Sequence, residues 1–240
     1  MSRLLPATSP ASYAVLSLSC LLYVATVLAT IRQGVMPGLG AGLFSLGGIS
    51  GKVLVEFGAS LPFPYTLAQP WRLVMAIFLH GSLLHIGMNM WVLMDIGPTV
   101  EELYGSARFF FLYVITGIVG FIASSATGHV SVGGSASLLG LIGLMLAVTI
   151  HRGGAAMQML RGQLIRWLIY IGIFGLLFHG IDNAAHLGGL AAGFLLGKIM
   201  VDRPPLAMEE HRRALILAWV TGAVVVASLC LTAWTALRGA

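Results

Sequence analysis

Charged side chains are scarce in this 240-residue chain, in which Asp, Glu, Lys and Arg together make up only 9% of the residues. A soluble domain of this size carries about 25% charged residues, so this chain has too little polar surface to cover a globule in water. Hydrophobic residues make up 58% of it instead. The composition therefore predicts an all-α polytopic membrane protein. Its long unbroken apolar runs differ from the alternating ten-residue segments of a transmembrane β-barrel.

Cysteine is also rare, and the two thiols, Cys20 and Cys230, both fall inside apolar runs. That placement favours neither a disulfide framework nor a metal site. The sequence also lacks a glycine-rich phosphate loop and a CxxC pair, so we expect no cofactor and no metal. The formal net charge of +5 could indicate nucleic-acid binding. Loop charges on one membrane face explain it better, and we expect no nucleic-acid partner.

Seven apolar segments predict seven membrane-spanning helices. At a rise of about 1.5 Å per residue, each segment crosses or nearly crosses a hydrocarbon core of about 30 Å. The segments are residues 12–31, 79–98, 107–127, 134–150, 164–180, 184–201 and 214–237. The first is too long for a signal peptide and is followed by others, so we expect it to be retained. The remaining assignments are a short cytoplasmic N-terminus over 1–11, a cytoplasmic linker over 202–213 and a seventh transmembrane helix within 214–240.

The connection over residues 32–78 is long and rich in glycine and proline, yet still apolar. A structureless loop of this length usually has a function or packs against something. We predict a partly helical, membrane-associated hairpin at the outer face, with a plain linker as the alternative. If the N-terminus is cytoplasmic, nine of the 13 Lys and Arg residues fall on the cytoplasmic side and four on the outer side. The positive-inside rule favours this orientation.

Polar side chains inside the predicted spans are candidates for function, because they are costly in a membrane. His85 and Asn89 are four residues apart and share one helix face. Ser135 follows two glycines at the start of another span, and His186 lies near the start of a third. In the predicted orientation, all of these residues lie near the outer end of the bundle. Three helices would thus deliver polar groups to one depth.

Two stripes of small residues predict which spans pack closely. One comprises Ala185, Gly189, Gly193 and Gly197, and the other Ala136, Gly140, Gly143 and Ala147. Such stripes let helix backbones approach each other in a membrane. Packing these two stripes together would bring the Ser135 hydroxyl and the His186 imidazole near hydrogen-bond distance, about 2.6–3.2 Å.

Several motifs, in this order and spacing, resemble those of the rhomboid family of intramembrane serine proteases. They are WR (71–72), HGSLLHIGMN (80–89), EELYG (101–105), GGSA (133–136) and AHLGGLAAG (185–193). The resemblance covers about residues 12–200. It implies a rhomboid-like six-helix core over 12–201, followed by one additional C-terminal transmembrane helix. Many relatives have glycine directly after the nucleophile, where this chain has Ala136.

The resemblance also implies a reaction, the hydrolysis of peptide bonds in or near transmembrane segments by a Ser–His dyad. Ser135 would be the nucleophile and His186 the base that takes its proton. His85, Asn89 and the backbone amide of Ser135 would stabilise the oxyanion. Gly133 and Gly134 would let the chain bend tightly before the nucleophile.

The expected partners are transmembrane protein substrates and the lipid bilayer. The expected location is a bacterial inner membrane, with the site opening to the outer face; oligomeric state is left open. One alternative is a catalytically inactive rhomboid-like protein that binds membrane clients. A small transporter is another, but it predicts a polar path across both leaflets, and these polar residues stay at one depth.

Some polar residues have simpler interpretations. Ser135 could be a plain helix cap, and His85 and Asn89 could join helices by hydrogen bonds. Asp182, four residues before His186, is expected to favour the helix dipole rather than to complete a triad.

For the other motif residues we expect structural roles. His80 is expected to tie the long connection to the bundle, and the Trp71-Arg72 pair to lie at the membrane interface, a depth that both residue types favour. Glu101 and Glu102 are expected to be structural, with Arg108 as a partner.

Overall fold

The computed structural model describes residues 9–36, 47–177, 180–200 and 202–238, and within these ranges it contains ten helices and no strand. Five of the helices are long and apolar enough to cross a membrane. They are α1 (Pro10–Arg32), α6 (Ser106–Ser125), α7 (Ser135–Arg152), α8 (Ala155–Leu177) and α10 (Met208–Arg238). The protein is therefore an all-α, multi-pass membrane protein, as the composition predicts.

Two further long helices occupy the other predicted spans. α5 (Leu83–Tyr104) carries polar residues along its length, including His85, Asn89 and Asp95, and α9 (Asn183–Ile199) has 17 residues. α9 is thus shorter than the other five, and α5 carries acidic residues, Asp95, Glu101 and Glu102, that the apolar spans lack over most of their length. Ser82 starts α5 by accepting a hydrogen bond from the His85 amide, so this helix begins four residues later than its apolar segment.

The connection before α5 folds differently from the predicted hairpin beside the bundle. Within its described part lie α2 (Gly51–Glu56), α3 (Tyr65–Ala68) and α4 (Arg72–Phe78). Every residue of α4 is buried, and the helix packs against α6 and α10. Because every residue after Arg72 is apolar, α4 can lie in the interior of the bundle rather than at its margin. Residues 37–46 of the connection lie outside the described residues.

Arg72 of the Trp71-Arg72 pair, which we expect at interface depth, turns its side chain into the protein. This side chain is 8% exposed, and its guanidinium donates to the carbonyls of Val55 at 2.6 Å and Ala59 at 3.3 Å. A planar guanidinium has five N–H donors, so one buried arginine can satisfy several carbonyls of an irregular segment. Arg72 therefore joins α4 to the end of α2.

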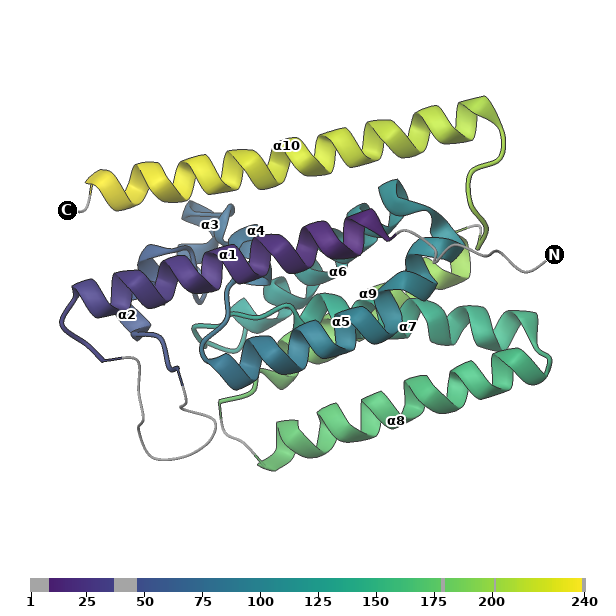
Figure 1. Cartoon of the computed structure of the whole chain (residues 1–240), viewed down its shortest axis with the longest axis horizontal. Coiled ribbons are helices and arrows are strands. Elements are labelled where there is room, and N and C mark those ends of the chain that lie inside the picture. The colour runs from purple at the N-terminus through teal and green to yellow at the C-terminus, as the bar shows by residue number, and fades with distance from the viewer. Residues whose placement is uncertain (1–8, 37–46, 178–179, 201, 239–240) are drawn as a thin grey trace.

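α7 lies at the centre of the molecule, with α9 packed along it (Figure 1). α1 and α10 lie on one side of this pair and α8 on the other (Figure 1). Most residues of α7 are buried, whereas α8 and α10 expose most of their surface. A helix buried on all sides must be apolar all round, which agrees with the long apolar run after Ser135.

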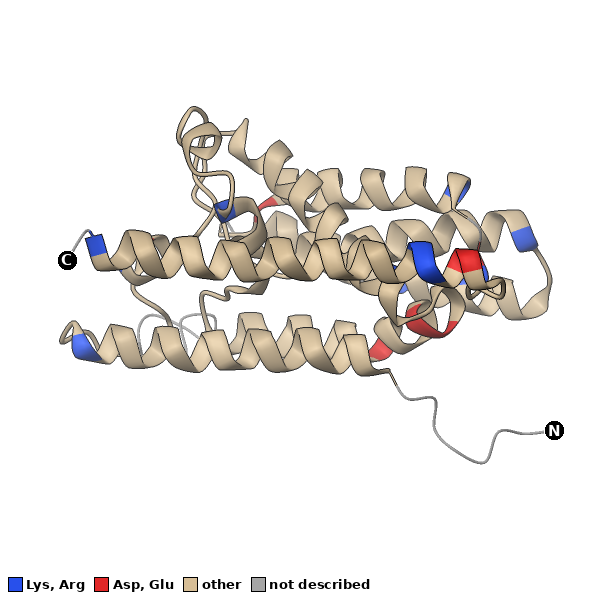
Figure 2. Ribbon diagram, turned by 90° about the horizontal axis from the view of Figure 1, so that it is seen from above, with Lys and Arg blue, Asp and Glu red and all other residues tan. Residues whose placement is uncertain are grey.

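Charged side chains gather at the end of the bundle where α1 and α10 begin (Figure 2). Glu101 accepts three hydrogen bonds there, from the amides of Ala11 and Ser12 and from the Ser12 hydroxyl, at 2.8–2.9 Å. The expected Glu101–Arg108 pair is therefore wrong, because this carboxylate is engaged at the start of α1. Arg108 instead donates to the Arg203 carbonyl at 3.0 Å.

The linker after α9 is shorter than predicted, because α10 begins at Met208 rather than at residue 214. Glu210 pairs with Arg203 at 2.8 Å and also accepts the Leu206 amide at 3.0 Å. An acidic side chain in the first turn of a helix satisfies amides that have no helical acceptor. These bonds explain why the helix extends into the charged stretch before its apolar segment.

Candidate active site

Ser135 and His186 form a hydrogen-bonded pair at the start of their helices. Gly134 is the N-cap of α7, and Ser135 is its first residue. The Ser135 Oγ lies 2.7 Å from the Nε2 atom of His186 in α9. Ser135 is therefore not a plain helix cap: its side chain faces another helix rather than the amides of its own. A hydroxyl at this distance from an imidazole nitrogen can transfer its proton directly.

The close packing of α7 and α9 makes this distance possible. A β-carbon on Gly189 would overlap the Ala136 carbonyl, and one on Gly193 would overlap the Gly140 carbonyl. The two backbones are thus in direct contact, which confirms the predicted pairing of the small-residue stripes. Gly120 of α6 accommodates the methyl group of Ala136, since a β-carbon there would lie 2.7 Å from it.

Gly133 leaves a gap beside the candidate nucleophile. Its φ of 135° is a conformation that residues with a side chain rarely adopt, and its amide donates to the Ala76 carbonyl at 2.8 Å. A β-carbon on Gly133 would lie 2.7 Å from the Nε2 of His85 and 3.7 Å from the Oγ of Ser135. A small group in this gap would touch the histidine and the serine together.

His85 presents a donor to that gap. The Gly81 amide donates to its Nδ1 at 3.4 Å, and a neutral imidazole that accepts at one nitrogen carries its proton on the other. The proton is then on Nε2, the atom that faces Gly133. The Ser135 amide is a second donor, because the N–H groups in the first turn of a helix have no acceptor within that helix. These two groups, both predicted to stabilise an oxyanion, thus lie beside the Ser135 hydroxyl.

Asn89 lies one helical turn after His85 in α5, and its role in oxyanion stabilisation stays a prediction. It is 5% exposed, and its Nδ2 donates to the His85 carbonyl of its own helix at 2.8 Å. Its Oδ1 faces Gly134, where a β-carbon would lie 3.5 Å from that oxygen and 2.6 Å from the Tyr113 hydroxyl. The side chain thus turns an acceptor, not a donor, toward the turn before Ser135. A half-turn of the amide would exchange the two atoms.

His80 supports the turn that carries Ser135, a contact that sequence reasoning missed. Its side chain is fully buried, and its Nε2 accepts the Gly134 amide at 3.4 Å. The ring packs edge-on against His85, with 5.1 Å between the ring centroids. We expected His80 to tie the long connection to the bundle, but its nitrogen holds the Gly133–Gly134 turn. Its spacing from His85 alone gives no signal of this contact.

Asp182 is the N-cap of α9, as its place before the helix suggests. Its Oδ1 accepts the Ala185 amide at 2.9 Å, and its Oδ2 accepts the Ser124 hydroxyl of α6. Burial raises the pKa of this carboxyl, but the hydrogen bonds from Ser124, Ala185 and Ser131 outweigh burial and bring the pKa below its ordinary value. Both oxygens accept hydrogen bonds from groups other than the imidazole, as a helix cap does, and the nearby His186 also lowers the pKa of the carboxyl.

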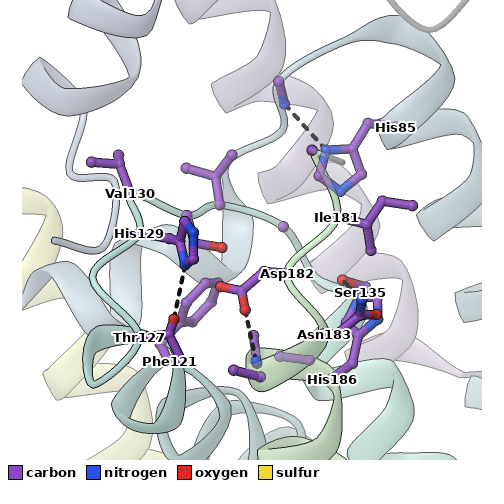
Figure 3. Close-up of a pocket in the computed structure, with 18 of the residues that line it drawn as sticks. His85, Phe121, Thr127, His129, Val130, Ser135, Ile181, Asp182, Asn183 and His186 are labelled. Atoms are coloured by element: carbon purple, nitrogen blue, oxygen red, sulfur yellow. Dashed lines mark hydrogen bonds between the residues drawn. The ribbon is translucent and has the colours of Figure 1, made fainter. Parts of the chain in front are cut away.

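A cavity of about 820 Å³ opens onto these groups. All four polar residues line it, and Figure 3 shows Ser135 and His186 side by side, with Asp182 to their left and His85 above them. Apolar side chains, among them Leu54, complete the lining. This volume falls in the range of small-molecule and cofactor pockets, about 300–1,000 Å³, so the cavity gives the serine hydroxyl room for a ligand.

The fold and site define a polytopic membrane protein with a serine–histidine pair in a cavity at one end of its bundle. The family model described as "Rhomboid domain" matches residues 67–203, more than half of the chain. The protein belongs to the rhomboid family. This match includes the residues around Ser135 and His186.

Curated relatives come from distant organisms. RHOMBOID-like protein 6, mitochondrial, of Arabidopsis thaliana is 36% identical over 61% of this chain and 48% of its own length. Rhomboid protease GluP of Bacillus subtilis (strain 168) is 34% identical over 62% of this chain and 29% of its own length. Rhomboid-like protease 2 of Toxoplasma gondii is 30% identical over 75% of this chain and 65% of its own length. The chain thus spans between 29% and 65% of the length of these three relatives.

Proposed function

We propose that the protein is an intramembrane serine endopeptidase that hydrolyses peptide bonds in or near the transmembrane segments of membrane proteins. The observation that carries this proposal is the 2.7 Å hydrogen bond between the Ser135 hydroxyl and the His186 imidazole. The family adds support, since two of the relatives above are named proteases.

In the first half of the reaction, the Ser135 Oγ attacks the carbonyl carbon of the scissile peptide bond, and its proton passes to the Nε2 of His186. The oxyanion that forms accepts hydrogen bonds from the Ser135 amide and from His85, in the gap left by Gly133. When the C–N bond breaks, the amine takes the proton from His186 and leaves. The part of the substrate on the N-terminal side of the cleaved bond stays on Ser135 as an ester.

In the second half, water attacks the ester carbonyl and gives its proton to His186. The bond to the Ser135 oxygen then breaks, and the serine recovers its proton from the imidazole. The product is a free carboxyl end, and both side chains return to their starting state. No metal or cofactor takes part in this scheme.

The bilayer shapes the choice of substrate. A transmembrane helix has its backbone groups bonded internally, so it must unwind locally before a carbonyl can reach Ser135. We therefore expect cleavage at sites with small or helix-weakening residues. The site lies where α5, α7 and α9 begin, and we propose that this end faces the outer side, with the N-terminus cytoplasmic. The charge bias of the loops supports that orientation.

The membrane in which the protein resides is a separate question. The relatives come from a plant, a bacterium and a parasite. Family membership alone therefore does not single out the bacterial inner membrane expected from the sequence.

The test uses the purified full chain in detergent or liposomes, with a single-span protein as substrate. The parent should cleave, whereas Ser135→Ala and His186→Ala should not. Ser137→Ala is the matched control, because this nearby serine is fully buried and its hydroxyl has no hydrogen-bond partner among the described residues. It should cleave at the rate of the parent.

A fluorophosphonate probe covers the case in which the chosen substrate is wrong. Labelling at Ser135 without cleavage would mean an active nucleophile that needs another substrate. If the parent neither cleaves the substrate nor reacts with the probe, the proposal is overturned. The result would then favour a rhomboid-like protein that binds membrane clients without cutting them. Equal cleavage by Ser135→Ala would show that another residue is the nucleophile.

A further inference from the structure

Asp182 connects the helix that carries His186 to the rest of the site. Its Oδ1 caps the Ala185 amide at 2.9 Å, and its main-chain carbonyl accepts the His186 amide at 3.1 Å. His186 therefore belongs to the first turn of α9, which is the part of a helix most prone to fray. The direction of the imidazole depends on whether this turn is wound.

The second carboxylate oxygen of Asp182 fixes this turn to another helix. Oδ2 accepts the hydroxyl of Ser124, a fully buried residue in the last turn of α6. A capping residue normally satisfies only amides of its own helix. This one bonds two helices at once, and both bonds come within one turn of the candidate catalytic histidine.

The same end of α6 also holds the segment that leads to Ser135. The Ser125 hydroxyl lies 2.9 Å from the Thr66 hydroxyl and 3.4 Å from that of Ser60. Ser60 exchanges two backbone hydrogen bonds with Ser131, at 3.0 and 3.1 Å. Ser131 is four residues before Ser135. The segments of the chain that bear the serine and the histidine are thus both anchored at the end of α6.

We propose that Asp182 is a positioning residue for the Ser135–His186 pair. By joining the start of α9 to the end of α6, its carboxylate fixes the place of the imidazole relative to the hydroxyl. The inference rests on the proposed function, because it concerns how that dyad is held. Asp182 does not act on the imidazole as the third member of a triad. Its contribution is geometric and passes through the first turn of α9.

The experiment measures how fast Ser135 reacts, separately from how much protein is folded. The purified full chain is mixed with a saturating fluorophosphonate probe, and the first-order rate constant and the labelled fraction are recorded. kcat and KM for a single-span substrate are measured in parallel. The variants are Asp182→Ala, Asp182→Asn and Ser124→Ala. Asp202→Ala is the control, since that aspartate pairs with Arg152 in the charged region away from the cavity.

Asp182→Ala should lower the labelling rate constant and kcat by about ten- to a hundredfold, with KM within about twofold, because a misplaced group slows chemistry more than binding. Asp182→Asn should restore both to within about threefold of the parent, since an amide oxygen also caps a helix and its NH₂ can bond the Ser124 oxygen. Ser124→Ala, which keeps the cap and removes the bridge, should show an intermediate loss. Asp202→Ala should match the parent.

Three results would overturn the inference. In the first, Asp182→Ala and Ser124→Ala react at the parent's rate constant. In the second, the variants lose labelled fraction while the remaining protein reacts at the parent's rate, as a purely structural role predicts. In the third, Asp182→Asn is as slow as Asp182→Ala, which would mean that the negative charge, not the bridge, is needed. If the parent itself is neither labelled nor cleaving, the proposed function fails, and this inference falls with it.

Discussion

Gly189 of α9 lies directly against the Ala136 carbonyl of α7, with no room for a β-carbon between them. Ala136 follows the candidate nucleophile, and Gly189 is three residues after the candidate base. The contact therefore fixes the separation of the two helices at the depth where Ser135 meets His186.

Gly189→Ala should push α9 away from α7 and lengthen the Ser135–His186 distance. A displacement of about 1 Å can cost about a hundredfold in rate, and we expect a loss of that order in fluorophosphonate labelling. Gly222→Ala is the control, since no atom lies within 4 Å of a β-carbon at that position of α10. Equal labelling of both variants would argue against the close contact.

Gly133→Ala should abolish labelling by filling the gap between His85 and Ser135. Gly128→Ala separates this effect from backbone strain, because Gly128 also has a positive φ, 83°, but no atom lies near a β-carbon there. Backbone strain should cost each variant about 1–3 kcal/mol of stability, and Gly133→Ala should lose more because of the contact with His85; a lower thermal midpoint measures both losses. Only Gly133→Ala should lose reactivity; a similar loss in Gly128→Ala would assign the effect to strain.

Glu101→Ala should destabilise the protein by about 1–3 kcal/mol, because it leaves the buried amides at the start of α1 without their acceptor. Glu101 is 4% exposed and accepts from Ala11 and Ser12. Unfolding in a titration with sodium dodecyl sulfate measures the change. Glu102→Ala, at the exposed neighbouring position, should stay within about 0.5 kcal/mol of the parent. The interpretation of Glu101 would be wrong if the two variants were equally stable.

Asp182 should make stability depend on pH only in strong acid. The pKa of Asp182 in the folded protein is lowered below the ordinary value of 3.8. Its hydrogen bonds therefore stabilise the fold fully above pH 3.8, and this stabilisation is lost as the pH falls through the native pKa. The stability difference between the parent and Asp182→Asn should be constant above about pH 5 and change below 3.8. A change centred above pH 5 would contradict the lowered pKa. Thermal midpoints across this range provide the measurement.

The sequence determined the class of protein and the candidate residues of its site. An apolar chain with few charges must form membrane helices, because lipid leaves backbone groups no other partners. Polar residues inside such helices are conspicuous for the same reason. The glycine stripes predicted which two helices touch, since only small residues allow that approach. The sequence alone was therefore enough to select Ser135, His186 and His85 as candidates.

Only the tertiary structure decided what the remaining polar groups contact. The burial of α4, the bonds from Arg72 to Val55 and Ala59, and the bond of Asp182 to Ser124 join segments far apart in the chain. Local patterns describe faces and spacings within one helix and contain no information on which loop passes beside it. Asn89 illustrates the limit: its helix face was predictable, but the direction of its amide depends on atoms contributed by other helices.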